Sequence, residues 1–203
     1  MDLRHAAFRL AGLWKATALA VEADQVARDG AAPTALRSAA MSALAKLDGE
    51  AAVTTLKPMV LDQKIPAELR RAALEALAVA DLAGTAATVA ALVTEADNKE
   101  DGFSLLPVLL KASGGPAALA TALQSGSAPD SVTAQEILNA LNRLGRRDAK
   151  LTPLLNQAIG RQSGAPEYDP ARVAAVVAAL HQGKGDAERG AEVYRMAQLA
   201  CTA

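Results

Sequence analysis

The chain has 203 residues, a net charge of −1 and an aromatic content of only 2%. Alanine makes up about a quarter of it, and because alanine is the strongest helix former and a poor strand former, we do not expect a β-sandwich or a β-barrel. The balance of 21 basic against 22 acidic residues argues against a dedicated nucleic-acid-binding protein, which usually carries a basic excess.

The sequence also bears on location and disulfides. No apolar run approaches the ~20 residues of a membrane-spanning helix, so we predict no direct membrane span. The N-terminus lacks the charged, apolar and cleavage-site regions of a signal peptide. Because the helical pattern begins at Leu3, we interpret Met1 as the start of an excised fragment. Cys201 is the one cysteine, so no disulfide forms within the chain.

A motif recurs every 33 residues. The pattern Leu-Arg-x-Ala-Ala-apolar begins at Leu3, Leu36 and Leu69, and Leu44 and Leu77 are also 33 residues apart. Each occurrence is interpreted as the first helix of a helix pair. One such pair is too small to bury its apolar side alone, whereas stacked pairs bury a continuous core. The sequence therefore predicts an array of stacked helix pairs.

Turn residues set the expected bounds of these helices. After the helix that starts at Leu3, prolines and Asp-Gly turns divide the chain into further helices, with Asp130 or Ser131 as an N-cap. The pattern loosens after residue 95 but continues, and we expect residues 97–99 and 125–129 to be loops, the second of them mobile. The expected helices are residues 34–47, 50–60, 66–80, 85–95, 104–111, 116–123, 131–144 and 148–159.

The composition changes after residue 160. Residues 162–167 are rich in turn formers, and residues 171–180 form a helix that is apolar on nearly all sides. We expect this helix to cap the last repeat and residues 181–185 to form a linker. The predicted organisation is a repeat domain over residues 1–163, a capping helix and linker over 164–184, and a separate tail over 185–203.

The 33-residue pattern resembles HEAT-like helical repeats, most clearly over residues 3–95 and more weakly to about residue 160. The resemblance implies an all-α fold, an α-solenoid of stacked helix pairs with a C-terminal helical tail. Ankyrin repeats have a similar period, and residues 34–39 faintly match one of their motifs, but the first and third repeats do not. Tetratricopeptide repeats need aromatic residues that are absent here.

Two features of the repeats admit two interpretations. The recurring Arg4, Arg37 and Arg70 cover apolar surface with their stems and pair with neighbouring acids, or they form a basic ladder for an acidic partner. The balanced net charge favours the first. Trp14 packs at the end of the first helix or under a repeat upstream of Met1, or it is an interface hot spot. We favour the packed interpretation.

Catalytic motifs are missing. His5 and His181 lie at opposite ends of the chain, and there is no His-Glu-x-x-His, Walker or Gly-x-Gly-x-x-Gly sequence. The acidic residues Glu95, Asp97, Glu100 and Asp101 lack the spacing of a calcium loop, so we favour a solvated loop over a weak cation site. We therefore predict no catalytic residue and no metal ligand, and no enzymatic activity for the chain itself.

The tail carries the most specific pattern. Asp186, Gly190 and Tyr194 match the Gly-Asp-x-x-x-Gly and aromatic opening of a c-type cytochrome domain, which the tail resembles. Cys201-Thr202-Ala203 then corresponds to the first half of the Cys-x-x-Cys-His haem attachment motif. Asp186 caps an expected helix over residues 187–199. The alternative is an ordinary terminal helix, and half of the motif binds no haem.

Repeats that run into such a tail are similar to large exported planctomycete proteins of the membrane-bound dehydrogenase or haem-binding type. The resemblance implies a β-propeller before the repeats, a c-type cytochrome domain after them and a periplasmic or exported location. The chain would then be a non-catalytic scaffold whose partners are other domains of the same polypeptide or other proteins. Haem c is expected in the full-length protein and none in the fragment. The alternative is a general protein-interaction module unrelated to haem.

Overall fold

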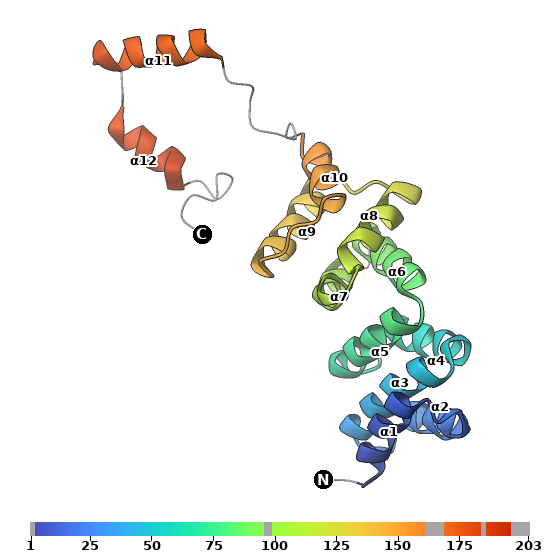
Figure 1. The fold of residues 1–203 in the computed structure, drawn as a ribbon. Coiled ribbons are helices and arrows are strands. Elements are labelled where there is room, and N and C mark those ends of the chain that lie inside the picture. Colours follow the sequence, from blue (N-terminus) through green and yellow to red (C-terminus); the bar gives the residue numbers. More distant parts are fainter. Residues whose placement is uncertain (1–2, 96–98, 161–168, 184–185, 196–203) are drawn as a thin grey trace. The chain divides into compact units, whose positions relative to one another are not determined.

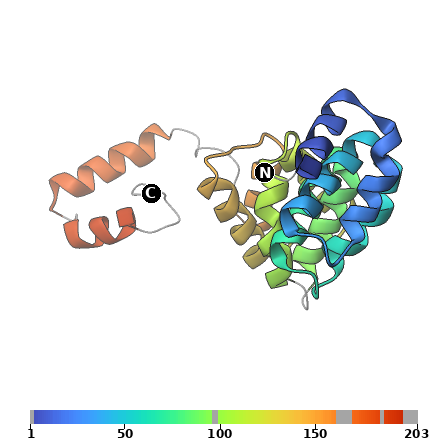
Figure 2. The same ribbon diagram turned by 90° about the horizontal axis from the view of Figure 1, so that it is seen from below.

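The structure of the protein is a computed structural model that describes residues 3–95, 99–160, 169–183 and 186–195. The chain is all-α, and no strand occurs in these ranges, as Figures 1 and 2 show. Its residues divide into two compact units, Met1–Ser163 and Gly164–Ala203.

The helices of the first unit follow one another with short connections. A short 3₁₀ turn, η1 (Thr17–Leu19), separates the first two. The α-helices of this unit are α1 (Leu3–Trp14), α2 (Ala20–Arg28), α3 (Thr34–Leu47), α4 (Gly49–Leu61), α5 (Ala67–Ala80), α6 (Leu82–Thr94), α7 (Lys99–Lys111), α8 (Gly115–Ser125), α9 (Ser131–Arg143) and α10 (Leu151–Ala158).

The 33-residue repeat of the sequence is also a repeat of backbone conformation. Pro33 and Pro66 precede α3 and α5 with nearly equal φ values of −55° and −52°. Asp48 and Asp81 both have φ of −147° and accept a hydrogen bond from a backbone N–H in the first turn of α4 and α6. An aspartate at this position satisfies a helix N-terminus that would otherwise lack an acceptor. In both pairs, therefore, a proline precedes the first helix and an aspartate precedes the second.

The first pair departs from this pattern at one position. Lys15 stands where Asp48 and Asp81 stand in the next two repeats, and a lysine cannot accept a hydrogen bond at a helix N-terminus. Its backbone has a positive φ of 56°, and its Nζ donates to the Lys46 carbonyl at 3.0 Å. Since no aspartate caps the second helix, the chain passes through η1 and α2 begins only at Ala20.

In the early pairs, the first helix of each pair packs against both helices of the pair before it. Helix α3 contacts both α1 and α2, and α5 contacts both α3 and α4. Figure 1 shows α1, α3 and α5 in succession. Further along, α6 contacts α7 and α8, α7 contacts α9, and α8 contacts α10. These contacts are those that stacked helix pairs predict; the solenoid itself stays an interpretation.

Small residues make this packing close. Ala40 and Ala73 are 0% exposed at equivalent positions of α3 and α5, with Leu44 and Leu77 buried one turn further on. Because alanine has a single methyl group, it lets two helices approach closely, while the leucines fill the remaining space. The core of these helices therefore combines small alanine side chains with larger leucine side chains.

Three predicted helix starts in the first unit were wrong by three residues or more, and the other bounds there differ by two residues at most. Helix α6 begins at Leu82 rather than residue 85, because Asp81 caps it with a 2.9 Å bond from Gly84 N–H. Lys99 belongs to α7, which starts five residues before the expected position, so Lys99 is not a loop residue. Helix α10 begins at Leu151 rather than 148, because Asp148 accepts from Leu151 N–H and precedes the helix. Asp97 and Asn98 lie outside the described residues.

The second unit contains α11 (Pro170–His181) and α12 (Ala187–Arg195). Asp169 caps α11, and Asp186 caps α12 by accepting from Arg189 N–H at 3.0 Å, as predicted. None of the residues of α11 is buried, and its valines and Leu180 are exposed. Its role as a cap of the last repeat stays a prediction. None of the helices in the described ranges has both the length and the apolar character required to cross a bilayer.

Gly102 permits a close contact between α7 and α6. A Cβ atom at Gly102 of α7 would lie 2.8 Å from the backbone of Leu92 and Val93 in α6. We expect Gly102→Ala to destabilise the fold by about 1–3 kcal/mol, although alanine favours a helix over glycine by about 1 kcal/mol. Chemical denaturation measures the difference. Gly49→Ala is the control, because nothing lies closer than 4.0 Å there, and it should leave stability unchanged or raise it.

Candidate functional site

Two arginines of the repeat bind the end of the preceding helix pair. Arg37 Nε donates to the Ala27 carbonyl at 3.1 Å, and Arg70 Nε donates to the Val60 carbonyl at 2.8 Å. Donors and acceptors are both 33 residues apart. The acceptors lie in the last turns of α2 and α4, where backbone carbonyls lack partners within their own helix. Each arginine therefore satisfies a helix C-terminus and places a positive charge at the negative end of its dipole.

Arg70 extends this contact to a third helix. Its guanidinium also donates to both carboxylate oxygens of Asp101 in α7, and Arg70 is only 4% exposed. Arg4 pairs with Glu22 at 3.2 Å. The interpretation that these arginines pair with neighbouring acids is confirmed for Arg4 and Arg70. A buried Arg70 is not a rung of a basic ladder for an outside partner.

A third arginine does the same and was missed by sequence reasoning. Arg146 Nη1 donates to the Leu110 carbonyl at 3.0 Å, near the C-terminus of α7. It comes after α9 rather than at the start of a first helix, so the 33-residue period gives no signal for it. Like Arg37 and Arg70, Arg146 donates to a carbonyl at the C-terminus of a helix in an earlier pair.

Removing Arg70 tests its structural role. We expect Arg70→Met to cost about 2–4 kcal/mol of unfolding free energy, because the Val60 carbonyl and the Asp101 carboxylate lose their partner at a buried site. Arg37→Met, which loses the bond to the Ala27 carbonyl at a half-buried position, should cost about 1 kcal/mol. Replacing Arg70 and Asp101 together by Met and Leu should cost less than Arg70→Met alone. Equal losses for both single variants would contradict this assignment.

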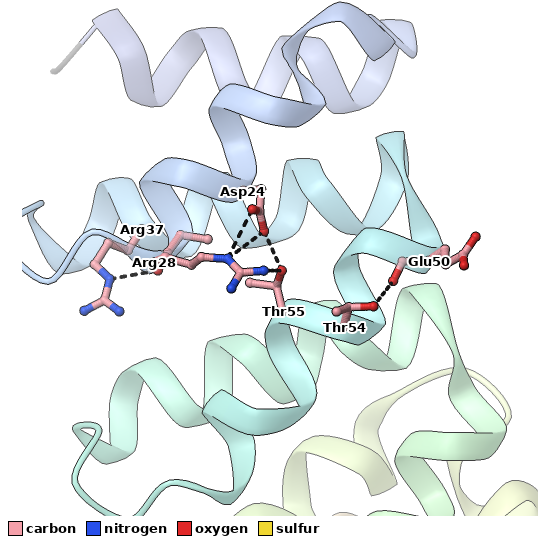
Figure 3. Close-up of polar contacts among 7 residues, drawn as sticks. Asp24, Arg28, Arg37, Glu50, Thr54 and Thr55 are labelled. Carbon is pink, nitrogen blue, oxygen red and sulfur yellow. Dashed lines mark hydrogen bonds and ion pairs between the residues drawn. The ribbon is translucent and has the colours of Figure 1, made fainter.

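A polar cluster of Asp24, Arg28 and Thr55 joins α2 to α4 (Figure 3). Arg28 Nε lies 3.1 Å from both carboxylate oxygens of Asp24, and its guanidinium donates to the Thr55 hydroxyl, which itself donates to Asp24. Thr55 is 4% exposed. Asp48, Glu50 and Thr54 complete a shallow hollow of about 330 Å³.

This cluster holds no catalytic arrangement. A nucleophile needs a base that takes its proton and a third group that orients the base. Here the carboxylate is bound to an arginine and the threonine hydroxyl bridges the two, so the three groups satisfy one another. The described part of the chain also holds no group of three or more histidine, cysteine or acidic residues placed to bind a metal. The cluster serves to connect two helix pairs.

An apolar groove lies between α8 and α10. It has a volume of about 860 Å³ and opens to solvent. Leu123 and Pro129 form one side and Pro153, Leu154 and Ala158 the other, with Lys150 and Gln157 among the polar lining residues. Such a groove suits an apolar side chain or a helix face of a partner better than a small polar substrate.

Asp130 ties the start of α9 to α7. The Lys99 ammonium donates to its carboxylate at 2.8 Å, and Thr133 N–H donates to it at 2.7 Å. The bond from Lys99, followed by the bonds from Thr133, holds the pKa of the Asp130 carboxyl well below its usual range. Of the two predicted N-caps, Asp130 is therefore the one that caps α9.

Replacing Lys99 tests this assignment. Because Lys99 contributes most, Lys99→Met should raise the pKa of Asp130 towards its ordinary value, as measured by NMR titration of the carboxyl carbon. Lys111→Met, which removes the same charge from the other end of α7, should leave it unchanged. A carboxyl with a lowered pKa stabilises the fold above its unfolded-state pKa, and this contribution disappears as the pH falls through the folded-state pKa.

The remaining predicted residues are scattered. Cys201 lies outside the described residues. His5 is half-buried in α1, and His181 ends α11 in the other unit. Of the acidic cluster, Asp101 is paired with Arg70 and Asp97 is not described. Trp14 is 74% exposed, so it does not pack at the end of the first helix, whereas its burial under a repeat upstream of Met1 stays a prediction.

No protein-family model, curated protein or solved structure matches the chain. The arguments for a function therefore rest on the sequence patterns and on the geometry described above.

Proposed function

We propose that the chain is a non-catalytic helical-repeat scaffold that links or docks a dehydrogenase-like domain and a c-type cytochrome domain in a larger exported redox protein. The proposal follows the resemblance of the repeats to HEAT-like arrays and of the tail to the opening of a cytochrome domain. A periplasmic or exported location belongs to the same proposal. The single observation that carries it is the tail pattern from Asp186 to Cys201.

The structure supports the local part of this pattern. Helix α12 starts directly after Asp186, whose carboxylate accepts from Arg189 N–H. A Cβ atom added at Gly190 would meet nothing within 4 Å, so packing against the described residues does not require a glycine at this position. A glycine within a helix suits a place where another helix or a cofactor approaches closely.

Haem would not be held by the described residues. Haem c needs two thioether bonds from cysteines and an axial histidine. The chain supplies one cysteine, Cys201, and its two histidines belong to different units. Under the proposal, Cys201 supplies one thioether and residues that follow Ala203 supply the other and the axial ligand. When bound, the haem would carry single electrons.

The alternative is a general protein-interaction module with no link to haem. The apolar groove between α8 and α10 favours it, because a groove of that size accepts a side chain or helix of a binding partner. The coding sequence on either side of this segment distinguishes the two functions. A Cys-His pair directly after Ala203 and a propeller upstream favour the redox scaffold.

The decisive experiment uses the natural coding sequence extended through the complete tail domain. Expressed with cytochrome c maturation machinery, the extended protein should carry covalent haem with a Soret band. Cys201→Ala should abolish or greatly reduce that band, because one of the two thioether bonds is lost. Ser113→Ala, an exposed position in the repeat unit, should not change it. A natural sequence without Cys-His at that place would end the proposal.

A further inference from the structure

Helix α1 has two apolar sides, and only one is packed. Phe8 and Ala11 are each 3% exposed on the side that contacts α3. Leu3, Leu10 and Trp14 lie on another side, and they are 87%, 42% and 74% exposed. With Ala7, also exposed, these residues are spaced at i, i+4, i+7 and i+11, which places them in one row along the helix. We call Leu3, Ala7, Leu10 and Trp14 the α1 stripe.

The equivalent rows of the next two repeats are buried. Thirty-three and sixty-six residues after Leu3, Leu36 and Leu69 are 5% and 2% exposed. The positions equivalent to Ala7 and Leu10 are all 4% exposed or less, and those equivalent to Trp14 are half-buried. These residues are Ala40 and Ala73, Ala43 and Ala76, and Leu47 and Ala80, respectively.

The helices that bury these rows are known from the contacts. Helix α3 contacts both helices of the pair before it, α1 and α2, and α5 contacts both α3 and α4. At the position equivalent to Leu10, the Cα of Ala43 in α3 lies 3.6 Å from the place of a Cβ atom at Gly12 of α1. The α1 stripe is thus equivalent to the surface with which α3 meets the preceding helix pair. No helix of the first unit covers it.

A repeat that ends an array is built differently. Terminal repeats carry a polar outer face, because that face stays in water. The α1 stripe presents a leucine, an alanine, a second leucine and the only tryptophan of the chain. Contiguous exposed apolar surface of this kind marks an interaction site.

We propose that the α1 stripe is the seat of a further helix pair of the same 33-residue type, stacked on α1 as α1 and α2 stack on α3. This inference rests on the comparison of equivalent positions and does not depend on the proposed redox role.

Charge favours a helix pair over a second copy of α1. Helix α1 carries Arg4, His5 and Arg9 and no acidic residue, so two α1 helices face to face would bring like charges together. A preceding helix pair instead presents the negative end of its second helix: Arg37 and Arg70, equivalent to Arg4, donate to the Ala27 and Val60 carbonyls there. A pair of this type therefore brings an apolar side together with acceptors that suit the positive charge of α1.

One residue changes the fit. Leu10 stands where Ala43 and Ala76 permit a close approach, so the incoming pair has to lie farther from α1 than the later pairs lie from each other. A test therefore includes Leu10→Ala, which restores the small residue of the internal repeats.

The experiment joins a copy of residues 33–68 to the chain in place of Met1 and Asp2, which keeps the repeat in register before Leu3. Trp14 is the only tryptophan and reports on its own surroundings. We expect its emission to move to shorter wavelength and its quenching by acrylamide to fall in the fused chain, with Leu10 or with Leu10→Ala. The 203-residue chain is the reference.

Leu3→Asp provides the matched control. In the 203-residue chain Leu3 is exposed, so the substitution should leave the thermal midpoint unchanged. In the fused chain Leu3 becomes buried like Leu36, so the same substitution should lower the midpoint and restore the emission of exposed tryptophan.

Two results would overturn the inference. Trp14 could keep the emission and quenching of the reference chain in both fused forms, which would show that the stripe does not accept a repeat. Light scattering could instead show that the 203-residue chain is a dimer that Leu3→Asp dissociates, which would assign the stripe to a second copy. Neither result bears on haem attachment, so the proposed function is tested separately.

Discussion

The packing of the first helices α3, α5 and α7 against both helices of the preceding pair is the constraint on which the fold depends. It requires small side chains where the helices approach, which is why Ala40 and Ala73 are fully buried and why Gly102 faces the backbone of α6. It also buries the ends of the second helices, whose last carbonyls need donors. Arg37 and Arg70 supply those donors, so the alanine content and the recurring arginine are two consequences of one packing arrangement.

Polar contacts between successive helix pairs recur at a constant residue spacing, although the chemical groups that make them differ. Three contacts between two side chains join residues 31 positions apart: Asp24 with Thr55, Arg70 with Asp101, and Lys99 with Asp130. The bond from the Lys15 ammonium to the Lys46 carbonyl has the same spacing. The spacing is constant because each helix pair places equivalent positions of the chain next to those of the following pair. The partners differ, from a hydroxyl to a guanidinium to an ammonium, so no single motif in the sequence reveals the series. Stacking geometry fixes where such contacts form, and the local sequence decides which groups make them.

The sequence predicted the helix pairs well where repeat and turn chemistry agree. Pro33 and Pro66 begin α3 and α5, and the 33-residue period carries the prediction from one to the other. It failed where capping by one side chain moved a boundary, as at Asp81 and Asp148. It also failed to find Arg146, because a contact with the Leu110 carbonyl depends on how distant segments pack and leaves no local pattern.

The first unit exposes large apolar side chains that its own packing does not use. Leu3 and Trp14 are exposed, so neither side chain contributes to the core of the unit. The buried polar groups, by contrast, are fully paired: among the described residues no buried side-chain nitrogen or oxygen lacks a partner. In the first unit, the described side chains that the packing leaves unused are therefore apolar ones on the surface, Leu3 and Trp14 among them. Contiguous exposed apolar surface of this kind is typical of interaction sites.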